Sequence, residues 1–406
     1  MGGVSFPSIL IVRDAYIRRV RPFMRKQIIK AFTGQRRVGK SYLLFQLMQL
    51  ILSEDPDANI IYINKEDLKF DAIKNATDLH DYVVKQMVAK KMNYVFIDEI
   101  QEIDAFEKAL RSLLLREEID LYCSGSNARL FSGELATMLS GRYIEINVLS
   151  LTYAEFIQFH KLDNTPKTLD LYFGFGGLPY LLHLPLEHEI VFDYLKNIYN
   201  TIVFRDVIDR HHIRNIRMLE RLVLFLADNT GSPFSANSIS NYLKSQQIKL
   251  APNQVQAYID YLVNAFLVHR VDRYDIKGKK YFETNEKYYF ENLGIRHALV
   301  GYKPQDMGKI LENVVYNQLL FNGWKVSTGQ FNQQEIDFVC EREGEKCYIQ
   351  VALRLDDEKT IQREFGNLLQ VEDNFPKKVI TLDEFSGNTF KGVEHQPIRS
   401  FLMEVN

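Results

Sequence analysis

Hydrophobic and polar positions follow two periods in the first 155 residues. Apolar runs of five or six residues, typical of buried strands, are separated by segments whose apolar residues recur at helical spacing. This alternation is typical of a parallel sheet flanked by helices. We therefore predict an α/β domain over residues 1–155. The predicted strands are 28–33, 59–64, 94–99, 119–123 and 143–148.

The pattern becomes mainly helical after residue 152. It predicts a helical lid over 156–215 and, over 216–298, a unit that resembles a winged helix. A winged helix either docks on DNA, mainly through phosphates, or only packs domains together, and the sequence leaves both open. Its predicted helices are 218–228, 235–246 with Ser235 as N-cap, and 253–266, and its ribbon strands are 267–274 and 280–289.

Residues 299–406 form a fourth predicted domain, which alternates helix and strand like a PD-(D/E)xK nuclease core. Such a core holds Mg²⁺ with an acid on one strand and an E-x-K triplet on the next. Asp337 fits the first acid, but Gln350 and Ala352 stand at the two charged positions of the triplet. A neutral amide is a weak Mg²⁺ ligand, so we predict a nuclease-like fold without nuclease chemistry. A DNA-processing nuclease is the alternative.

A glycine-rich loop follows the first predicted strand and precedes a predicted helix. Residues 34–41, G-Q-R-R-V-G-K-S, match G-x-x-x-x-G-K-[ST]. In such a loop the main-chain amides cradle phosphates, Lys40 reaches the β- and γ-phosphates, and Ser41 binds Mg²⁺. The residues predicted to bind nucleotide are Gly34, Gln35, Arg36, Arg37, Val38, Gly39, Lys40, Ser41 and Tyr42.

Two carboxylates, Asp98 and Glu99, end the third predicted strand. Ligands of a parallel sheet bind beyond the carboxyl ends of its strands, so the pair should lie near the loop. We expect Asp98 to hold Mg²⁺ with Ser41, and Glu99 to orient a water toward the γ-phosphate.

Further catalytic candidates follow the fourth strand and precede the fifth. Residues 124–127, S-G-S-N, should lie between the acidic pair and the loop, where Ser126 or Asn127 would sense the γ-phosphate. An ordinary turn is an equal alternative. Arg142 could complete the nucleotide site of a neighbouring copy, or it could be a surface residue. The predicted catalytic residues are Glu99, Lys40, Asn127 and Arg142.

Composition adds limits on partners and location. The chain has 406 residues, 46% of them hydrophobic, with a net charge of -2. Residues 1–40 carry ten basic residues against one acid, which could face nucleic acid, a protein or nucleotide. Cys123, Cys340 and Cys347 resemble core residues, and no apolar stretch is long enough for a membrane span. We expect a cytoplasmic protein.

Several motifs together resemble one family. The chain is similar to bacterial and archaeal AAA+ P-loop ATPases, archaeal-ATPase-like, whose C-terminal domain of unknown function ends in a PD-(D/E)xK nuclease-like fold. The matching segments are T-G-Q-R-R-V-G-K-S at 33–41, F-I-D-E-I-Q at 96–101, S-G-S-N at 124–127, L-S-G-R at 139–142, G-G-L-P at 176–179, K-Y-Y-F at 287–290 and E-I-D-F-V at 335–339.

The resemblance implies binding and hydrolysis of ATP with Mg²⁺, but no biological process. Partners would be ATP, DNA or a protein, and a second copy of the chain. A P-loop kinase is a weaker alternative, because an acidic pair suits a water nucleophile better than an alcohol.

Overall fold

The computed structural model describes residues 5–130, 139, 141–332, 334–355, 358–384 and 389–404. The chain divides into two compact units. The first consists of Met1–Leu149 and Asn264–Phe266, and the second of Ser150–Val263 and Leu267–Asn406. Each unit is described by itself.

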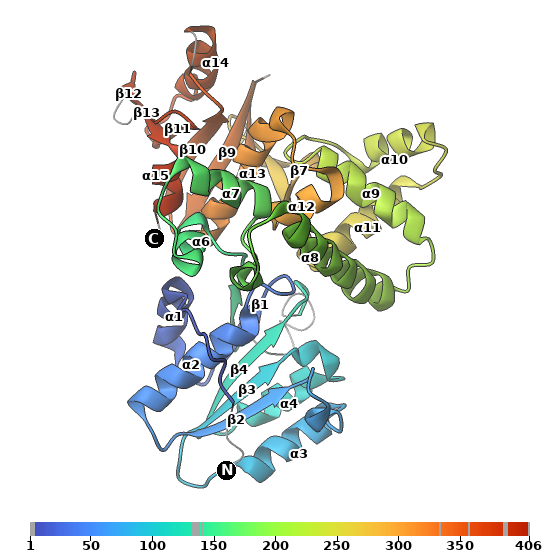
Figure 1. Cartoon of the computed structure of the whole chain (residues 1–406), viewed down its shortest axis with the longest axis vertical. Helices are drawn as coiled ribbons and strands as arrows, with labels where there is room; N and C mark the ends of the chain where they lie inside the picture. Colours follow the sequence, from blue (N-terminus) through green and yellow to red (C-terminus); the bar gives the residue numbers. More distant parts are fainter. Residues whose placement is uncertain are drawn as a thin grey trace. The chain divides into compact units, whose positions relative to one another are not determined.

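A five-stranded parallel sheet, in the order β2-β3-β4-β1-β5, forms the centre of the first unit. Figure 1 shows α1 and α2 on one side of this sheet and α3 and α4 on the other. The strands are β1 Ile29–Thr33, β2 Asn59–Asn64, β3 Asn93–Asp98, β4 Ile119–Gly125 and β5 Tyr143–Asn147; the helices are α1 Asp14–Val20, η1 Arg21–Phe23, α2 Lys40–Glu54, η2 Leu68–Phe70, α3 Ala76–Gln86, η3 Ile100–Glu102 and α4 Phe106–Leu113.

Alternation of side chains along the strands gives the sheet two different faces. One face carries aliphatic residues such as Val95 and Leu121, which pack with Leu110 and other residues of α3 and α4. The opposite face carries stacked aromatic rings, with Phe96 and Tyr122 4.4 Å apart. The predicted parallel α/β sheet is confirmed, and β4 lies between β3 and β1 as expected.

The second unit contains an eight-stranded mixed sheet in the order β12-β13-β11-β10-β9-β8-β6-β7. Helix α13 packs on one face and α14 on the other. Its strands are β6 Val268–Asp275, β7 Lys280–Phe290, β8 Lys325–Phe331, β9 Gln334–Arg342, β10 Glu345–Ala352, β11 Lys377–Thr381, β12 Thr389–Phe390 and β13 Val393–Pro397. Its helices are α6 Tyr153–His160, α7 Pro166–Phe175, η4 Pro179–His183, α8 His188–Thr201, η5 Ile202–Asp209, α9 Ile216–Asp228, α10 Ala236–Ser245, α11 Pro252–Asn264, α12 Leu293–Val300, η6 Pro304–Asp306, α13 Met307–Phe321, α14 Glu358–Leu369 and α15 Ile398–Met403.

The ribbon expected to close a winged helix extends this larger sheet. Strands β6 and β7 form the predicted hairpin, and β6 also pairs in parallel with β8 through Arg273, Tyr274 and Asp275. The three expected helices are present as α9, α10 and α11, and Ser235 caps α10 by accepting the amide of Ser238. The division at residues 155, 215 and 298 stays a prediction.

Candidate functional site

The glycine-rich loop turns directly from β1 into α2, and the backbone requires glycine at both of its glycine positions. Gly39 has φ +97° and forms the N-cap of α2. Gly34 has φ +152°, and a Cβ there would lie 2.2 Å from the carbonyl oxygen of Val148. The strand before the loop and the helix after it therefore hold the loop in a tight, fixed turn.

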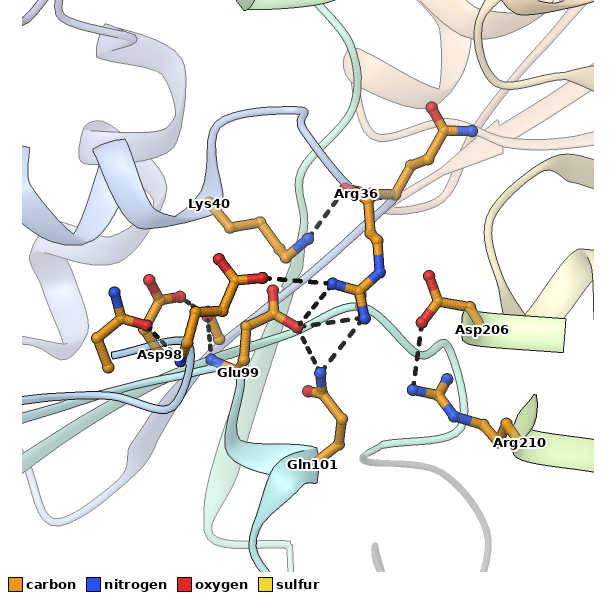
Figure 2. A network of polar contacts seen from close by, with 12 residues as sticks. Arg36, Lys40, Asp98, Glu99, Gln101, Asp206 and Arg210 are labelled. Atoms are coloured by element: carbon orange, nitrogen blue, oxygen red, sulfur yellow. Dashed lines mark hydrogen bonds and ion pairs between the residues drawn. The ribbon is translucent and has the colours of Figure 1, made fainter. Parts of the chain in front are cut away.

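Lys40 is the first residue of α2, and its side chain folds inside the loop. Its Nζ donates to the carbonyl oxygens of Gly34 and Gln35, each at 2.9 Å, and the residue is buried. Figure 2 shows the ammonium pointing toward the loop backbone, close to the carboxylate of Glu99, which follows β3. A buried ammonium in a cup of main-chain groups is suited to an anionic ligand.

Asp98 ends β3 on the aromatic face of the sheet, the same face that α2 covers. Its carboxylate accepts hydrogen bonds from the hydroxyls of Ser41 and Ser124, and from Tyr62 at 3.3 Å. Burial raises the pKa of Asp98, and the Ser124 and Ser41 hydrogen bonds oppose that rise.

This pair of oxygen ligands fits a Mg²⁺ ion. Mg²⁺ is commonly bound by one or two protein oxygens, with water and phosphate oxygens completing an octahedron. Ser41 and Asp98 already share a hydrogen bond, so both oxygens are within reach of one small cation. Within the described ranges, no group of three or more His, Cys, Asp or Glu side chains could hold a metal ion. Water and phosphate oxygens of a bound nucleotide would complete the coordination of Mg²⁺ at Ser41 and Asp98.

Glu99 follows Asp98 in a left-handed conformation, with φ 56° and ψ 53°. Its amide donates to Ser124 Oγ at 3.1 Å, and its carboxylate accepts hydrogen bonds from Gln101 Nε2 and from Ser126 Oγ at 3.3 Å. The guanidinium of Arg36 lies 3.8 Å from Glu99 Oε2. The backbone turn therefore directs the side chain of Glu99 away from that of Asp98.

The electrostatic surroundings keep Glu99 ionised. Burial alone would raise the pKa of Glu99, but the charges of Lys40 and Arg36, with the hydrogen bonds from Gln101 and Ser126, lower it below the ordinary value. The two neighbouring carboxyl groups thus differ, because Asp98 has a raised pKa and Glu99 a lowered one.

The residues after β4 are placed differently from one another. Ser124 and Ser126 contact the acidic pair, as the strand order predicts. Asn127 does not point its amide oxygen there, because Asn127 Oδ1 accepts the amide of Arg129 at 3.0 Å in a local turn. Of the two candidates in this turn, the structure therefore places Ser126 against Glu99, whereas the catalytic role of Asn127 stays a prediction.

Arg142 lies at the other end of the sheet from the loop. Its carbonyl oxygen accepts the amide of Ile29, where β1 begins, whereas the loop follows Thr33, where β1 ends. Its side chain is exposed and lines a cavity of about 380 Å³ with Lys108 and Arg111. Within one chain, Arg142 is therefore not brought to Lys40 and Glu99. Of the 139–142 motif, residue 140 lies outside the described part of the chain.

The remaining loop residues divide into buried and exposed groups. Gln35, Arg36 and Val38 are buried, and Gln35 Nε2 donates to the carbonyl of Phe266 at 2.8 Å. Arg37 and Tyr42 are exposed. The loop thus presents one arginine to the acidic pair and the other to solvent.

Arg13 supports the loop from outside the motif. Its guanidinium donates to the carbonyl oxygens of Val38 at 3.0 Å and Leu149 at 3.1 Å, and the residue is buried. In the sequence, Arg13 is only one of the ten basic residues of the N-terminal stretch. Its position just before α1 does not predict that its side chain would hydrogen-bond to the loop.

A second charged cluster lies in the other unit, around the buried Lys287 of β7. Its Nζ contacts Glu312 at 2.8 Å and Glu335 at 2.7 Å. Burial opposes the charged form, but Glu312, Asp337 and Glu335 outweigh it and raise the pKa of Lys287. Asp337 is buried beside the cluster, and its pKa is raised by burial and by the charge of Glu312. A lysine side chain therefore supplies the cation among these carboxylates.

Sequence comparison with known proteins assigns the chain to a family. An AAA domain model matches residues 26–157, which include the loop and the acidic pair, and a domain of unknown function (DUF8612) matches residues 166–306. A protein of Haemophilus influenzae, described as uncharacterized, is 33% identical over 393 residues, covering 95% of this chain and 96% of the relative. The chain belongs to this family of AAA-domain proteins.

Other relatives and structures extend the comparison. An uncharacterized protein of Methanocaldococcus jannaschii is 29% identical over 392 residues, covering 90% of this chain and 85% of the relative. A Walker-type ATPase of Pyrococcus abyssi is 14% identical with a TM-score of 0.46, covering 72% of this chain and 96% of that one. The structure of Aeropyrum pernix ORC1 in complex with DNA is 14% identical in sequence, with a TM-score of 0.32. The match covers 72% of this chain and 93% of that one. Both scores are below 0.5, so the assignment to the AAA-domain family depends on the sequence matches. Among the described helices of this AAA-domain protein, none is long and apolar enough to cross a membrane.

Proposed function

We propose that this AAA-domain protein binds ATP with Mg²⁺ and hydrolyses it to ADP and phosphate. The observation that carries the proposal is the convergence of three charged residues in one unit. Lys40 lies inside the glycine-rich loop, Asp98 is hydrogen-bonded to Ser41, and Glu99 is held ionised beside them. The match of an AAA domain model to residues 26–157 supports nucleotide binding at this site.

Each residue has a separate part in this chemistry. The loop amides and Lys40 bind the β- and γ-phosphates, and Ser41 and Asp98 hold Mg²⁺, which would neutralise charge on the phosphate oxygens when bound. The carboxylate of Glu99 accepts a hydrogen bond from water and orients it toward the γ-phosphorus. Ser126 and Gln101 fix the direction of that carboxylate through their hydrogen bonds.

A Lys40→Ala variant tests nucleotide binding directly. We expect wild-type protein to bind ATP with Mg²⁺ in isothermal calorimetry, and the variant to bind it about a hundredfold more weakly, because hydrogen bonds to a charged donor are lost. Lys85→Ala, at an exposed site on α3, is the matched control and should bind like wild type. Equal affinity in Lys40→Ala, with unchanged melting, would remove Lys40 from the site and contradict the proposal.

The nucleotide state would be communicated to DNA or a protein partner through the second unit. The helices α9, α10 and α11 support this step because they occupy the predicted positions of a winged helix. Arg142 is exposed at the sheet end far from Lys40, so it would serve only the site of a second copy. The three cysteines are free and buried, as suits a protein of the cytoplasm.

A nuclease is the second candidate function, and the cluster around Lys287 favours it. An ammonium from β7 lies beside Glu312 and Glu335, with Asp337 adjacent, which partly supplies the charges missing at Gln350 and Ala352. A lysine near an acid could steady the charge that develops on a cleaved phosphodiester.

Supercoiled plasmid incubated with the full chain and Mg²⁺ or Mn²⁺ tests this candidate. Active nuclease chemistry predicts nicked or linear products that disappear in Asp337→Asn, which keeps the size of the side chain but cannot ionise. Asp193→Asn, at an exposed carboxylate paired with Lys196 outside the cluster, controls for altered folding and for contaminating nuclease. Plasmid that stays supercoiled with both metals rules the candidate out.

A further inference from the structure

Arg36 is the third residue of the glycine-rich loop, yet its charge is directed at carboxylates. Its guanidinium lies 3.7 Å from Glu66 Oε1 and 3.8 Å from Glu99 Oε2, and the residue is 7% exposed. Figure 2 shows it reaching from the loop toward Glu99, on the same side as Lys40. The adjacent Arg37 is exposed, so burial selects one of two neighbouring arginines for this contact.

The contact joins the phosphate-binding loop to the residue that would orient water. A guanidinium stays charged at every physiological pH and binds carboxylate and phosphate oxygens with the same planar set of donors. The γ-phosphate of a bound triphosphate carries more charge than one carboxylate. It would therefore compete with Glu99 for the same guanidinium.

We propose that Arg36 is a two-position residue, which holds Glu99 when no triphosphate is bound and moves to the γ-phosphate oxygens when ATP binds. This inference rests on the proposed function, since it requires ATP in the loop. In the first position the Arg36 guanidinium lies 3.8 Å from Glu99 Oε2 and holds the carboxylate by charge attraction. In the second position its charge moves to the γ-phosphate, and the Glu99 carboxylate is left to accept a hydrogen bond from water.

The other partners of Glu99 make the exchange possible without loss of orientation. Gln101 and Ser126 both donate to Glu99 Oε2, and both lie outside the glycine-rich loop. When the guanidinium leaves, they still fix the carboxylate.

In the hydrolysis step, the water oxygen bonds to the γ-phosphorus and the bond from the γ-phosphorus to the β,γ-bridging oxygen breaks. The bridging oxygen keeps the electron pair on ADP, and the proton from water passes to the phosphate product or to solvent.

The exchange gives Arg36 two separable effects. It should contribute to turnover, because an arginine on the γ-phosphate stabilises the charge on the transferred group. It should also contribute to discrimination between triphosphate and diphosphate, because ADP has no γ-phosphate for it to bind. A residue that only supports the loop would change the affinity for both nucleotides.

The test compares Arg36→Ala, Arg36→Lys and a surface control, Arg116→Ala, whose partner is Glu118. Phosphate release gives kcat and KM, and calorimetry gives affinities for ADP and for AMPPNP, which is not hydrolysed. We expect Arg36→Ala to lower kcat about tenfold or more and to weaken AMPPNP binding but not ADP binding. Arg36→Lys should recover part of the kcat, since it restores the charge without the planar donors.

Three outcomes would overturn the inference. If Arg36→Ala keeps the kcat and the AMPPNP preference of wild type, Arg36 does not reach the γ-phosphate. If affinity for ADP and AMPPNP falls equally, Arg36 only supports the loop. If Arg36→Ala turns over faster with unchanged preference, the arginine only restrains Glu99. A wild-type protein that binds neither nucleotide would instead refute the proposed function, and the Arg36 inference with it.

Discussion

Replacing Glu99 with glutamine is expected to reduce ATP hydrolysis by about 10²-fold or more while ATP binding is retained. Glutamine has nearly the shape of glutamate, so hydrogen bonds within the Ser126 and Gln101 cluster can be kept in part. The amide, however, lacks the negative charge that orients and polarises a water molecule. Because Lys40 and Arg36 lower the pKa of Glu99 despite its burial, the wild-type residue is ionised at neutral pH, and the variant loses that full charge.

Phosphate release and calorimetry with ATP and Mg²⁺ check this result together. Glu102→Gln, at an exposed carboxylate on η3 three residues away, is the matched control and should turn over like wild type. The lowered pKa also means that acidification protonates Glu99 only below its ordinary range. The wild-type rate should therefore not fall through Glu99 titration near pH 6 or 7. Full turnover in Glu99→Gln would remove Glu99 from its proposed role.

The centre of the first unit's sheet could be predicted because β1, β3 and β4 are buried along their whole length. A strand covered on both faces is a continuous apolar run, and β3 lies within one residue of the predicted range 94–99. Asp98 and Glu99 were found for the same reason, because an abrupt change from apolar to acidic residues marks the carboxyl end of a strand. The loop could be predicted because its two glycines adopt positive φ angles, which other residues rarely adopt, so they are diagnostic in the sequence.

The hydrogen-bond and ion-pair partners of the predicted site residues could not be predicted from the sequence. The sequence does not show which neighbour receives Arg36, because Glu66 and Glu99 come from separate connections of the sheet. Ser124 had no role of its own among the predicted turn residues 124–127, whereas β4 continues to Gly125 and brings Ser124 to Asp98. Asn127 and Ser126 are one residue apart, and only the local turn decides which of them faces Glu99.

Charge counting does not separate buried from exposed basic residues. The N-terminal basic stretch could face nucleic acid, a protein or nucleotide, and Arg18, Arg21, Arg25 and Lys26 are exposed. The structure buries two others, Arg13 against loop carbonyls and Lys30 against Asp120. In the second unit, Lys287 reaches carboxylates that lie 25 and 48 residues further along the chain. Such long-range pairs depend on tertiary packing, which a single sequence does not specify.

Replacing Asp120 with asparagine is expected to destabilise the first unit by about 3 kcal/mol. Lys30 and Asp120 form an ion pair between β1 and β4, and both are fully buried. Asp120 Oδ2 also accepts hydrogen bonds from Tyr122 at 2.7 Å and from the amide of Arg25 at 2.8 Å. Asparagine keeps an acceptor for these groups but leaves the Lys30 ammonium buried without an opposite charge.

The stability of the Asp120→Asn variant should depend on pH, and the direction of this dependence identifies the unpaired Lys30 ammonium as the cause. Burial lowers the pKa of Lys30, and Asp120 opposes that decrease. Without Asp120 the folded-state pKa falls further, so the folded protein binds fewer protons than the unfolded chain. The stability of Asp120→Asn should therefore rise with pH, from the lowered folded-state pKa up to the ordinary value for lysine. The wild type should show this rise more weakly.

Hydrogen exchange of the β1 and β4 amides is the suitable measurement, because the single tryptophan, Trp324, belongs to the second unit and gives no fluorescence signal for this sheet. The double variant Lys30→Met with Asp120→Asn removes both charges and should recover much of the loss, since a buried apolar side chain carries no unpaired charge. If the double variant is instead as unstable as the sum of the two single variants, the ion pair contributes nothing beyond its separate contacts. The destabilisation would then come from packing around Lys30.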